Sequence, residues 1–301
     1  MRANAGVQNR PVPTYTDAYG VTITYYVWPA RNPRAVVQIA HGVGEHAGRY
    51  SELAGVLNEA GYTVYADDHR GHGQTGLDQH GGDASLIGRL GPGGLLAAVA
   101  GVHQLSGIIK EEHPGLPLVL LGHSWGSFMV QMILNKYAAE YDAVVLTGTA
   151  YRWPRYLDSG DLNRKHKHLG TTGVEWLSRD PAVAAAFIAD PLCTTTPLAK
   201  LFGLREAARI FGRPAVGLPP DLPLLIQVGG DDTVGGERSA LMLANAYTRR
   251  SGLRDIHLIV YPGARHEVFN ETNRAEVFAD LLAWLDAHVP ALVEGSDSQG
   301  D

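Results

Sequence analysis

The sequence predicts a single α/β fold with a mostly parallel sheet and helices on both of its faces. Short apolar runs alternate along the chain with helical segments, which is typical of a parallel sheet. The chain has 301 residues, 45% of them hydrophobic, so it can bury one large core. A serine enclosed by glycines follows one of the strand-like runs and gives the third indication.

The first third of the chain contains three strand signals and one clear helix. A helix that starts near Ser51 should end at Gly61, because glycine is favoured just after the last helical turn. Residues 71–94 are rich in glycine and are expected to form an irregular loop. Their G-x-G-x-x-G pattern at 71–76 does not indicate a nucleotide site, because no helix is expected to open there. The strand signals are 21–27, expected to be antiparallel, and the buried runs 35–40 and 62–66.

The most informative stretch is the G-x-S-x-G motif of residues 122–126. It directly follows the apolar run 117–121, and residues 127–134 continue well as a helix. A strand, a tight turn between glycines and a helix together indicate a nucleophile elbow, with the Ser124 hydroxyl exposed at the turn. The helix N-terminus beneath the serine favours negative charge that develops nearby.

Turns after later strands supply an acid and a base. One strand is followed by Asp231 and Asp232, and the last strand is followed by His266, on a glycine-containing turn before the final helix. Serine, then aspartate, then histidine is the chain order of the α/β-hydrolase fold, and it differs from the orders of the two well-known serine protease folds. The strand-like runs of this part are 143–146, 223–228 and 256–261.

Five segments spread over nearly the whole chain carry a family resemblance. At residues 41–50, 68–73, 122–126, 230–232 and 261–267 the chain resembles the α/β-hydrolases of the monoacylglycerol lipase and lysophospholipase-like group, classified with the serine aminopeptidases of S33 type. The resemblance implies an eight-stranded, mostly parallel sheet flanked by helices, with a helical cap inserted after the sixth strand. One departure is Trp125, where the group commonly has methionine. Because of this difference, the resemblance does not determine the shape of the acyl pocket.

The resemblance also implies the roles of the site residues. Ser124 would be the nucleophile, His266 the base and Asp232 the acid that orients it, with Asp231 as the competing carboxylate. The offset of the aspartates from Gly229 also favours Asp232.

The loop after the third strand is expected to complete an oxyanion hole. The fold uses the N–H after the nucleophile, here that of Trp125, and an N–H from this loop, which by resemblance is that of Val43. His41 is expected to be structural rather than catalytic. Three further residues are expected to form a polar network that fixes the loop: Glu45, His46 and Arg49.

The interval from Thr149 to Asp221 is far longer than an ordinary connection and contains helix signals, which predicts a cap. Asp180 and Pro181 have the positions of an N-cap and a first helical residue before a helix over 182–189. The expected boundaries are 1–150 and 217–290 for the core, 151–216 for the cap and 291–301 for a disordered tail. The expected substrate-binding residues are Gly42, Trp125, Tyr151, Trp153 and Trp176.

These observations predict a serine hydrolase that needs no cofactor or metal and cleaves esters with an apolar acyl chain. Monoacylglycerol or a lysolipid-like ester is the expected substrate by family resemblance. Two alternatives stay open: an amidase or aminopeptidase on the same triad, which would need an acidic residue to hold a substrate amine, and an inactive binding protein. The acidic candidates in the cap are Asp158, Asp161 and Glu175.

Composition excludes several partners. A net charge of −6 gives no electrostatic support for a nucleic-acid partner.

The first ten residues lack the apolar core of a signal peptide, and no segment approaches the length of a membrane span. The single cysteine, Cys193, fits a reducing compartment, and a cytoplasmic location is expected. Transient membrane contact through the cap and the oligomeric state are left open.

Overall fold

The chain folds around one eight-stranded sheet in the order β1-β2-β4-β3-β5-β6-β7-β8. The computed structural model describes residues 12–158 and 160–289, so the expected tail at 291–301 and the first ten residues lie outside the described part. Strands β3 to β8 pair in parallel, whereas β1 and β2 are antiparallel to their neighbours. The strands are β1 Thr14–Thr16, β2 Thr22–Trp28, β3 Ala35–Ala40, β4 Tyr62–Asp67, β5 Leu118–His123, β6 Ala143–Thr147, β7 Leu224–Gly229 and β8 Ile256–Tyr261.

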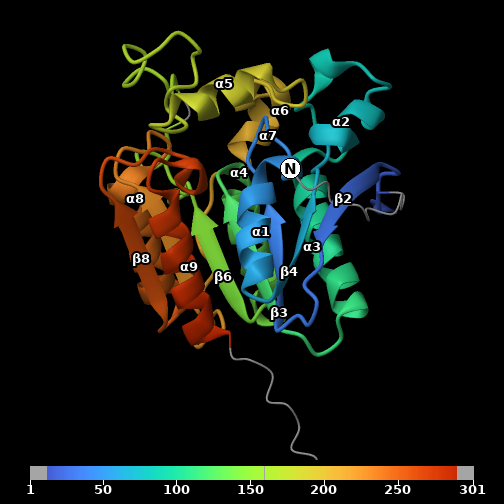
Figure 1. Ribbon diagram of the computed structural model, residues 1–301, viewed down its shortest axis with the longest axis vertical. Helices are drawn as coiled ribbons and strands as arrows, with labels where there is room; N and C mark the ends of the chain where they lie inside the picture. Colours follow the sequence, from blue (N-terminus) through green and yellow to red (C-terminus); the bar gives the residue numbers. More distant parts are fainter. Residues whose placement is uncertain (1–11, 159, 290–301) are drawn as a thin grey trace, which may run out of the picture.

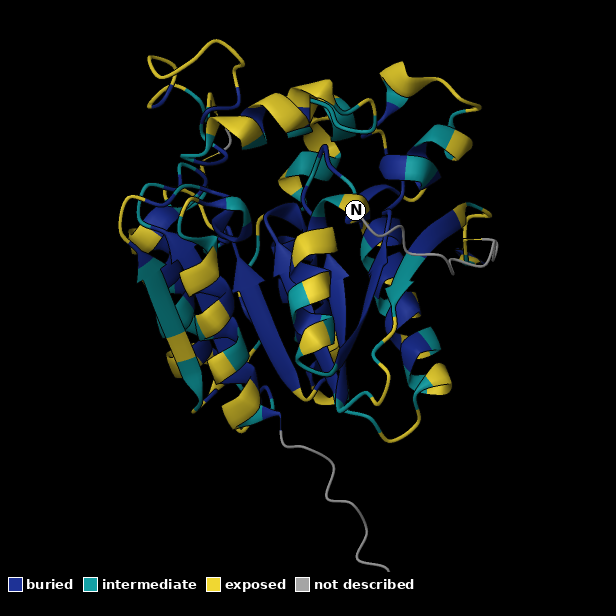
Figure 2. Cartoon of the chain, viewed as in Figure 1, coloured by how far each residue is buried: buried dark blue, intermediate teal, exposed yellow. Residues whose placement is uncertain are grey.

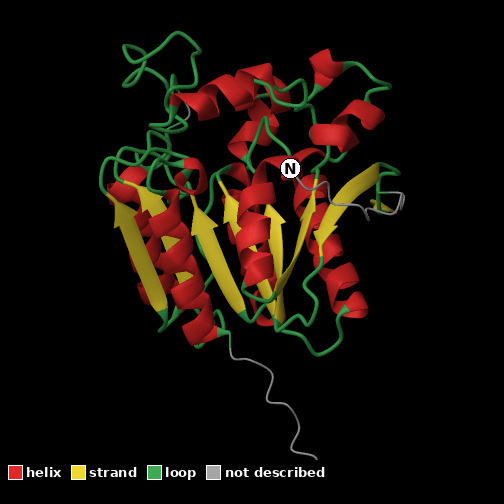
Figure 3. Cartoon of the chain, in the orientation of Figure 1, coloured by secondary structure: helices red, strands yellow, loops and turns green. Residues whose placement is uncertain are grey.

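Helices cover both faces of the sheet and form two separate apolar cores (Figures 1 and 3). Helices α1 and α9 pack on one face, and α3, α4 and α8 pack on the other. Every residue of β3, β4 and β5 is buried, as expected for parallel strands that are covered on both sides (Figure 2). These helices are α1 Ser51–Glu59, α3 Gly94–Glu112, α4 Trp125–Tyr137, α8 Gly236–Ala246 and α9 Arg274–His288.

Between β6 and β7, the described residues form three helices, which lie above the carboxyl ends of the strands (Figure 1). The predicted helix over 182–189 is confirmed as α5, because Pro181 begins it and the Asp180 carboxylate accepts the Ala182 N–H at 2.9 Å. The three helices are α5 Pro181–Ala189, α6 Leu198–Phe202 and α7 Leu204–Ala208.

The prediction of an irregular loop over 71–94 is wrong in part. Helix α2, Gly73–Gln79, opens within the G-x-G-x-x-G pattern, and a short 3₁₀ turn follows at Ala84–Leu86. The Asp68 carboxylate accepts the N–H of Gln74 at 2.7 Å, and a Cβ on Gly73 would clash with that carboxylate. The start of α2 is therefore filled by an acidic side chain, which leaves no room for a phosphate. Within the described part of the chain, no helix is long and apolar enough to cross a membrane.

Candidate active site

Ser124 lies on a sharp turn between β5 and α4. Its backbone has φ 53° and ψ −123°, a conformation that costs energy for a residue with a side chain. The flanking glycines permit the turn, because a Cβ on Gly126 would clash with the Ala40 carbonyl and one on Gly122 would lie 2.7 Å from the Ser127 Cα. The Ser124 N–H donates to the Thr147 carbonyl of β6 at 3.0 Å. The strand, turn and helix predicted around Ser124 are thus present.

His266 and Asp232 meet on the loops that follow β8 and β7. The His266 Nδ1 lies 3.0 Å from Asp232 Oδ1, which also accepts the Val234 N–H at 2.8 Å. Both side chains are buried, and His266 Nε2 has no partner within the described residues. Asp231 instead lies 2.8 Å from the Lys165 ammonium, with its side chain 44% exposed. Only Asp232 therefore has the geometry of a histidine-orienting acid.

The electrostatic surroundings raise the pKa of His266. Burial acts to lower that pKa, but the charge of Asp232 and its hydrogen bond outweigh burial, and Glu267 and Glu45 contribute in the same direction. A second imidazole, that of His123, lies with its ring centroid 4.9 Å away. Burial first, and then the charge of His266, lower the pKa of His123 to about 4, so His123 stays neutral near pH 7.

The loop after β3 approaches Ser124 closely. A Cβ on Gly42 would lie 3.1 Å from the Ser124 Cβ and 2.7 Å from Glu45 Oε1, so any side chain there would force a neighbour to move. The Gly42 N–H donates to Glu45 Oε1 at 2.6 Å and is therefore engaged. The next amide along, that of Val43, is left as the candidate oxyanion donor, beside the N–H of Trp125 at the start of α4.

A buried ionic network holds this loop against the loop that carries His266. Arg49 donates to Glu45 at 2.6 Å and makes two hydrogen bonds with Glu267, at 2.7 and 2.8 Å. Burial alone would raise the pKa of Glu267, but Arg49 lowers it to about 2. The Tyr50 hydroxyl also donates to Glu45, at 2.8 Å. Glu45 and Arg49 thus form the expected network, with Glu267 as a member that sequence reasoning missed.

His41 and His46 lie outside this network. His41 is fully buried and stacks on His69, with ring centroids 3.9 Å apart, and its Nε2 accepts the His69 N–H. His46 bonds instead to Asp190 at the end of α5, at 2.9 Å. His41 therefore packs within the core, and His46 connects the loop to the segment above it.

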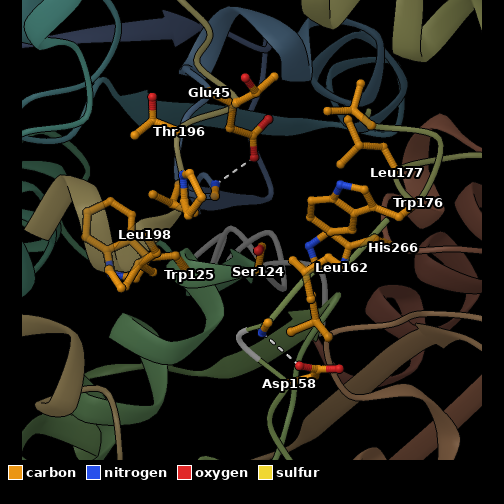
Figure 4. A pocket seen from close by; sticks show the side chains of 18 of the residues that line it. Glu45, Ser124, Trp125, Asp158, Leu162, Trp176, Leu177, Thr196, Leu198 and His266 are labelled. Atoms are coloured by element: carbon orange, nitrogen blue, oxygen red, sulfur yellow. Dashed lines mark hydrogen bonds between the residues drawn. The ribbon is translucent and has the colours of Figure 1, made fainter. Parts of the chain in front are cut away.

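A cavity of about 470 Å³ opens above Ser124 (Figure 4). Gly42, Trp125 and Trp176 of the expected binding residues line it. Tyr151 and Trp153 do not line it. The further apolar residues that line it include Phe128, Leu157, Leu162, Leu177, Phe187, Leu198, Ile210 and Phe211.

Trp153 and Tyr151 have partners outside the cavity. Trp153 is 39% exposed and lies under the Arg213 guanidinium, 3.8 Å from its ring centroid. Tyr151 donates its N–H to Ser239 and packs edge-on against Tyr156. Both side chains therefore pack outside the cavity, in the segment between β6 and β7.

Trp125 contributes to the cavity wall with no exposed surface of its own. Its indole stacks on His72, with centroids 5.0 Å apart, and packs against Phe202 of α6 at 5.1 Å. The larger side chain of Trp125, in place of methionine, is therefore accommodated by packing between the core and α6.

The site has a strained serine between a strand and a helix. A carboxylate and a histidine follow it along the chain and bond to each other. This arrangement on this sheet defines an α/β-hydrolase. The family model described as "Serine aminopeptidase, S33" matches residues 31–273, and the chain belongs to this family. A monoacylglycerol lipase of Mycolicibacterium smegmatis is 36% identical, over 92% of this chain and 97% of that protein. The human monoglyceride lipase is 26% identical, over 94% of this chain and 93% of that protein. A Bacillus coagulans carboxyl esterase, solved in complex with glycerol, superposes with a TM-score of 0.80 at 25% identity, over 93% of this chain and 99% of that one.

Proposed function

We propose that this protein is a serine hydrolase that cleaves carboxylic esters with an apolar acyl chain, with monoacylglycerol or a lysolipid-like ester as the substrate. The observation that carries the proposal is a largely apolar cavity that opens directly above Ser124 and beside the buried His266–Asp232 pair. The similarity to monoacylglycerol lipases over nearly the full length of both chains supports the same substrate class.

The proposed reaction assigns one role to each residue of the candidate triad. Ser124 Oγ attacks the acyl carbonyl while His266 Nε2 takes its proton, and Asp232 stabilises the imidazolium that forms. The amides of Val43 and Trp125 stabilise the oxyanion of the tetrahedral intermediate. The ester C–O bond then breaks, His266 returns the proton to the leaving alcohol, and water cleaves the acyl-enzyme.

The position of His266 orients the substrate in the cavity. The leaving oxygen must come within hydrogen-bond reach of His266 Nε2, so the alcohol lies on the side of Trp176. Figure 4 shows Leu198 and Trp125 on the opposite side of Ser124. The acyl chain would therefore extend between α4 and α6, against apolar side chains.

Residues 151–216 would act as the cap, and 1–150 with 217–290 as the core. Leu204 of α7 lines the cavity and is also 82% exposed, so it lies at the mouth. Ile188 of α5 and Phe211 are exposed too, which gives this face several apolar contacts for a transient membrane encounter. A cytoplasmic location remains a prediction from the single cysteine.

An amidase or aminopeptidase is the second candidate. Asp158 and Asp161 line the cavity, and a carboxylate there could hold a substrate amine. Asp158 Oδ1 already accepts the N–H of Gly160 at 2.8 Å, which makes it a weaker anchor. Glu175 is engaged by Asn163 and Thr172 within its own loop.

Turnover on a graded panel tests the proposal. Glycerol esters and p-nitrophenyl esters with acyl chains from acetyl to oleoyl would be compared with aminoacyl naphthylamides. We expect hydrolysis of the esters with a preference for medium or long chains, and none in Ser124→Ala. Faster release from the naphthylamides would favour the amidase, and no turnover of any member by a folded enzyme would favour a binding protein.

A further inference from the structure

A cluster of metal-binding side chains lies at the end of the sheet away from the cap, where β8 begins and α9 ends (Figure 1). Asp255 directly precedes β8, His257 is its second residue, and His288 is the last residue of α9. The carboxylate and the two imidazoles each offer a ligand atom, and these atoms all lie within 4.8 Å of one another. The cluster is remote from Ser124, and ester hydrolysis makes no use of it.

The hydrogen bonding of His288 prepares it to accept a cation. Its Nδ1 lies 2.6 Å from the Trp284 carbonyl oxygen, which only accepts, so Nδ1 carries the proton of the neutral ring. The unprotonated Nε2 then faces Asp255 Oδ2 at 3.4 Å. Two acceptors in contact repel each other unless a proton or a metal ion lies between them. An outer hydrogen bond from the second ring nitrogen to a carbonyl is also typical of metal-ligating histidines.

The two imidazole-to-carboxylate distances are close to those around a small tetrahedral ion. Ligands bound to zinc at 2.0–2.1 Å lie about 3.3–3.4 Å apart along an edge of the tetrahedron. The His257 Nε2 lies 3.1 Å from Asp255 Oδ1, and the His288 Nε2 lies 3.4 Å from the other carboxylate oxygen, Oδ2. The C-terminal end of the 15-residue helix α9 adds a partial negative charge that favours a cation.

A second cluster of side chains that could hold a metal ion consists of His46, Asp190 and Cys193, and it differs from the first. The Nδ1 of His46 accepts the Gly48 N–H at 3.2 Å, so its Nε2 carries the proton and donates to Asp190 at 2.9 Å. This pair is satisfied without an ion. The His257–Asp255 contact is of the same kind, so the contrast between the two clusters rests on the Nε2 of His288, which faces Asp255 without a proton. Burial raises the pKa of the neighbouring Cys193 thiol, which disfavours the thiolate that a metal needs.

We propose that Asp255, His257 and His288 bind one divalent transition-metal ion, with Zn²⁺ as the best match to two imidazoles and a carboxylate. Water would complete the tetrahedron. The bound ion joins the start of the edge strand β8 to the end of α9, and so holds the last helix of the described chain against the sheet.

Zinc titration of the untagged full chain, stripped of metal beforehand, tests the site. We expect calorimetry to give one Zn²⁺ per chain with a Kd of roughly micromolar order. Asp255→Asn and His257→Ala should each weaken binding by at least about 10-fold. At about 100 times the wild-type Kd, Zn²⁺ should raise the Tm by roughly 5 °C, and a 10-fold loss of affinity in the variants should cut this rise to about half or less.

Cys193→Ser is the matched control, because it removes a ligand from the contrasting cluster and should leave zinc binding unchanged. His257 is exposed, so His257→Ala should fold, which circular dichroism would verify. Binding weaker than about 1 mM would reduce the cluster to hydrogen-bonded pairs and overturn the proposal. Loss of binding in Cys193→Ser rather than in His257→Ala would also overturn it.

Discussion

Replacing Asp232 with asparagine removes a charge while keeping the shape of the acid. The Val234 N–H donates to Asp232 Oδ1, so the amide oxygen of asparagine should take this position and still accept from His266 Nδ1. The tautomer of His266 is then preserved, and the loss is that of the ion pair in the transition state. Opposite charges about 4 Å apart at an effective dielectric constant of 20 attract by about 4 kcal/mol. At about 1.4 kcal/mol per factor of ten, kcat should fall about 10³-fold. This is less than the roughly 10⁴-fold loss expected where the base takes the wrong tautomer.

Asp231→Asn is the matched control for this change. It breaks only the exposed contact with Lys165, which is worth at most about 1 kcal/mol of stability, and kcat should stay within about 3-fold of wild type. Steady-state hydrolysis of p-nitrophenyl butyrate measures both variants. In Asp232→Asn the midpoint of the kcat/KM profile should also move to lower pH, because the charge that raises the pKa of His266 is gone. A larger penalty for Asp231→Asn, or a loss below 10-fold for folded Asp232→Asn, would refute this reasoning.

In the wild type, the raised pKa of His266 means that kcat/KM should rise with pH to a plateau, with a midpoint above about 6.5; a flat profile from pH 5 to 9 would exclude a histidine base. Val43→Pro removes the proposed oxyanion donor and should cost about 10²–10³ in kcat, whereas Val43→Ala should retain most activity. If a folded Val43→Pro enzyme kept its kcat, the donor would lie elsewhere. Trp176→Ala should lower kcat/KM about 10-fold, since its ring lies 4.7 Å from that of His266, and Trp153→Ala should change it little; equal effects would contradict the cavity assignment.

The sheet and the positions of the candidate triad could be predicted because local sequence determines them. Buried parallel strands are continuous apolar runs. Ser124 directly follows β5, and Asp232 and His266 lie in the loops that follow β7 and β8. The start of α5 could be predicted for the same reason, because the adjacent residues Asp180 and Pro181 mark it.

Features that depend on tertiary contact could not be predicted. Helix α2 is rich in glycine and forms because Asp68, from the preceding loop, accepts the N–H of Gln74 in its first turn. The aromatic residues of the cap have no periodicity that separates cavity-lining Trp176 from exposed Trp153. Glu267 joins Arg49 across 218 positions of sequence, which no local pattern reveals.

Fluorophosphonate labelling followed by peptide mass spectrometry tests the central claim, that Ser124 is an activated nucleophile, most directly. The wild-type enzyme should gain one adduct, on the peptide that contains Ser124, and lose its esterase activity in proportion to labelling. Folded Ser124→Ala, with a nearly unchanged Tm, should gain no adduct and have no esterase activity. An adduct on another residue, or labelling and turnover that persist in Ser124→Ala, would contradict the claim.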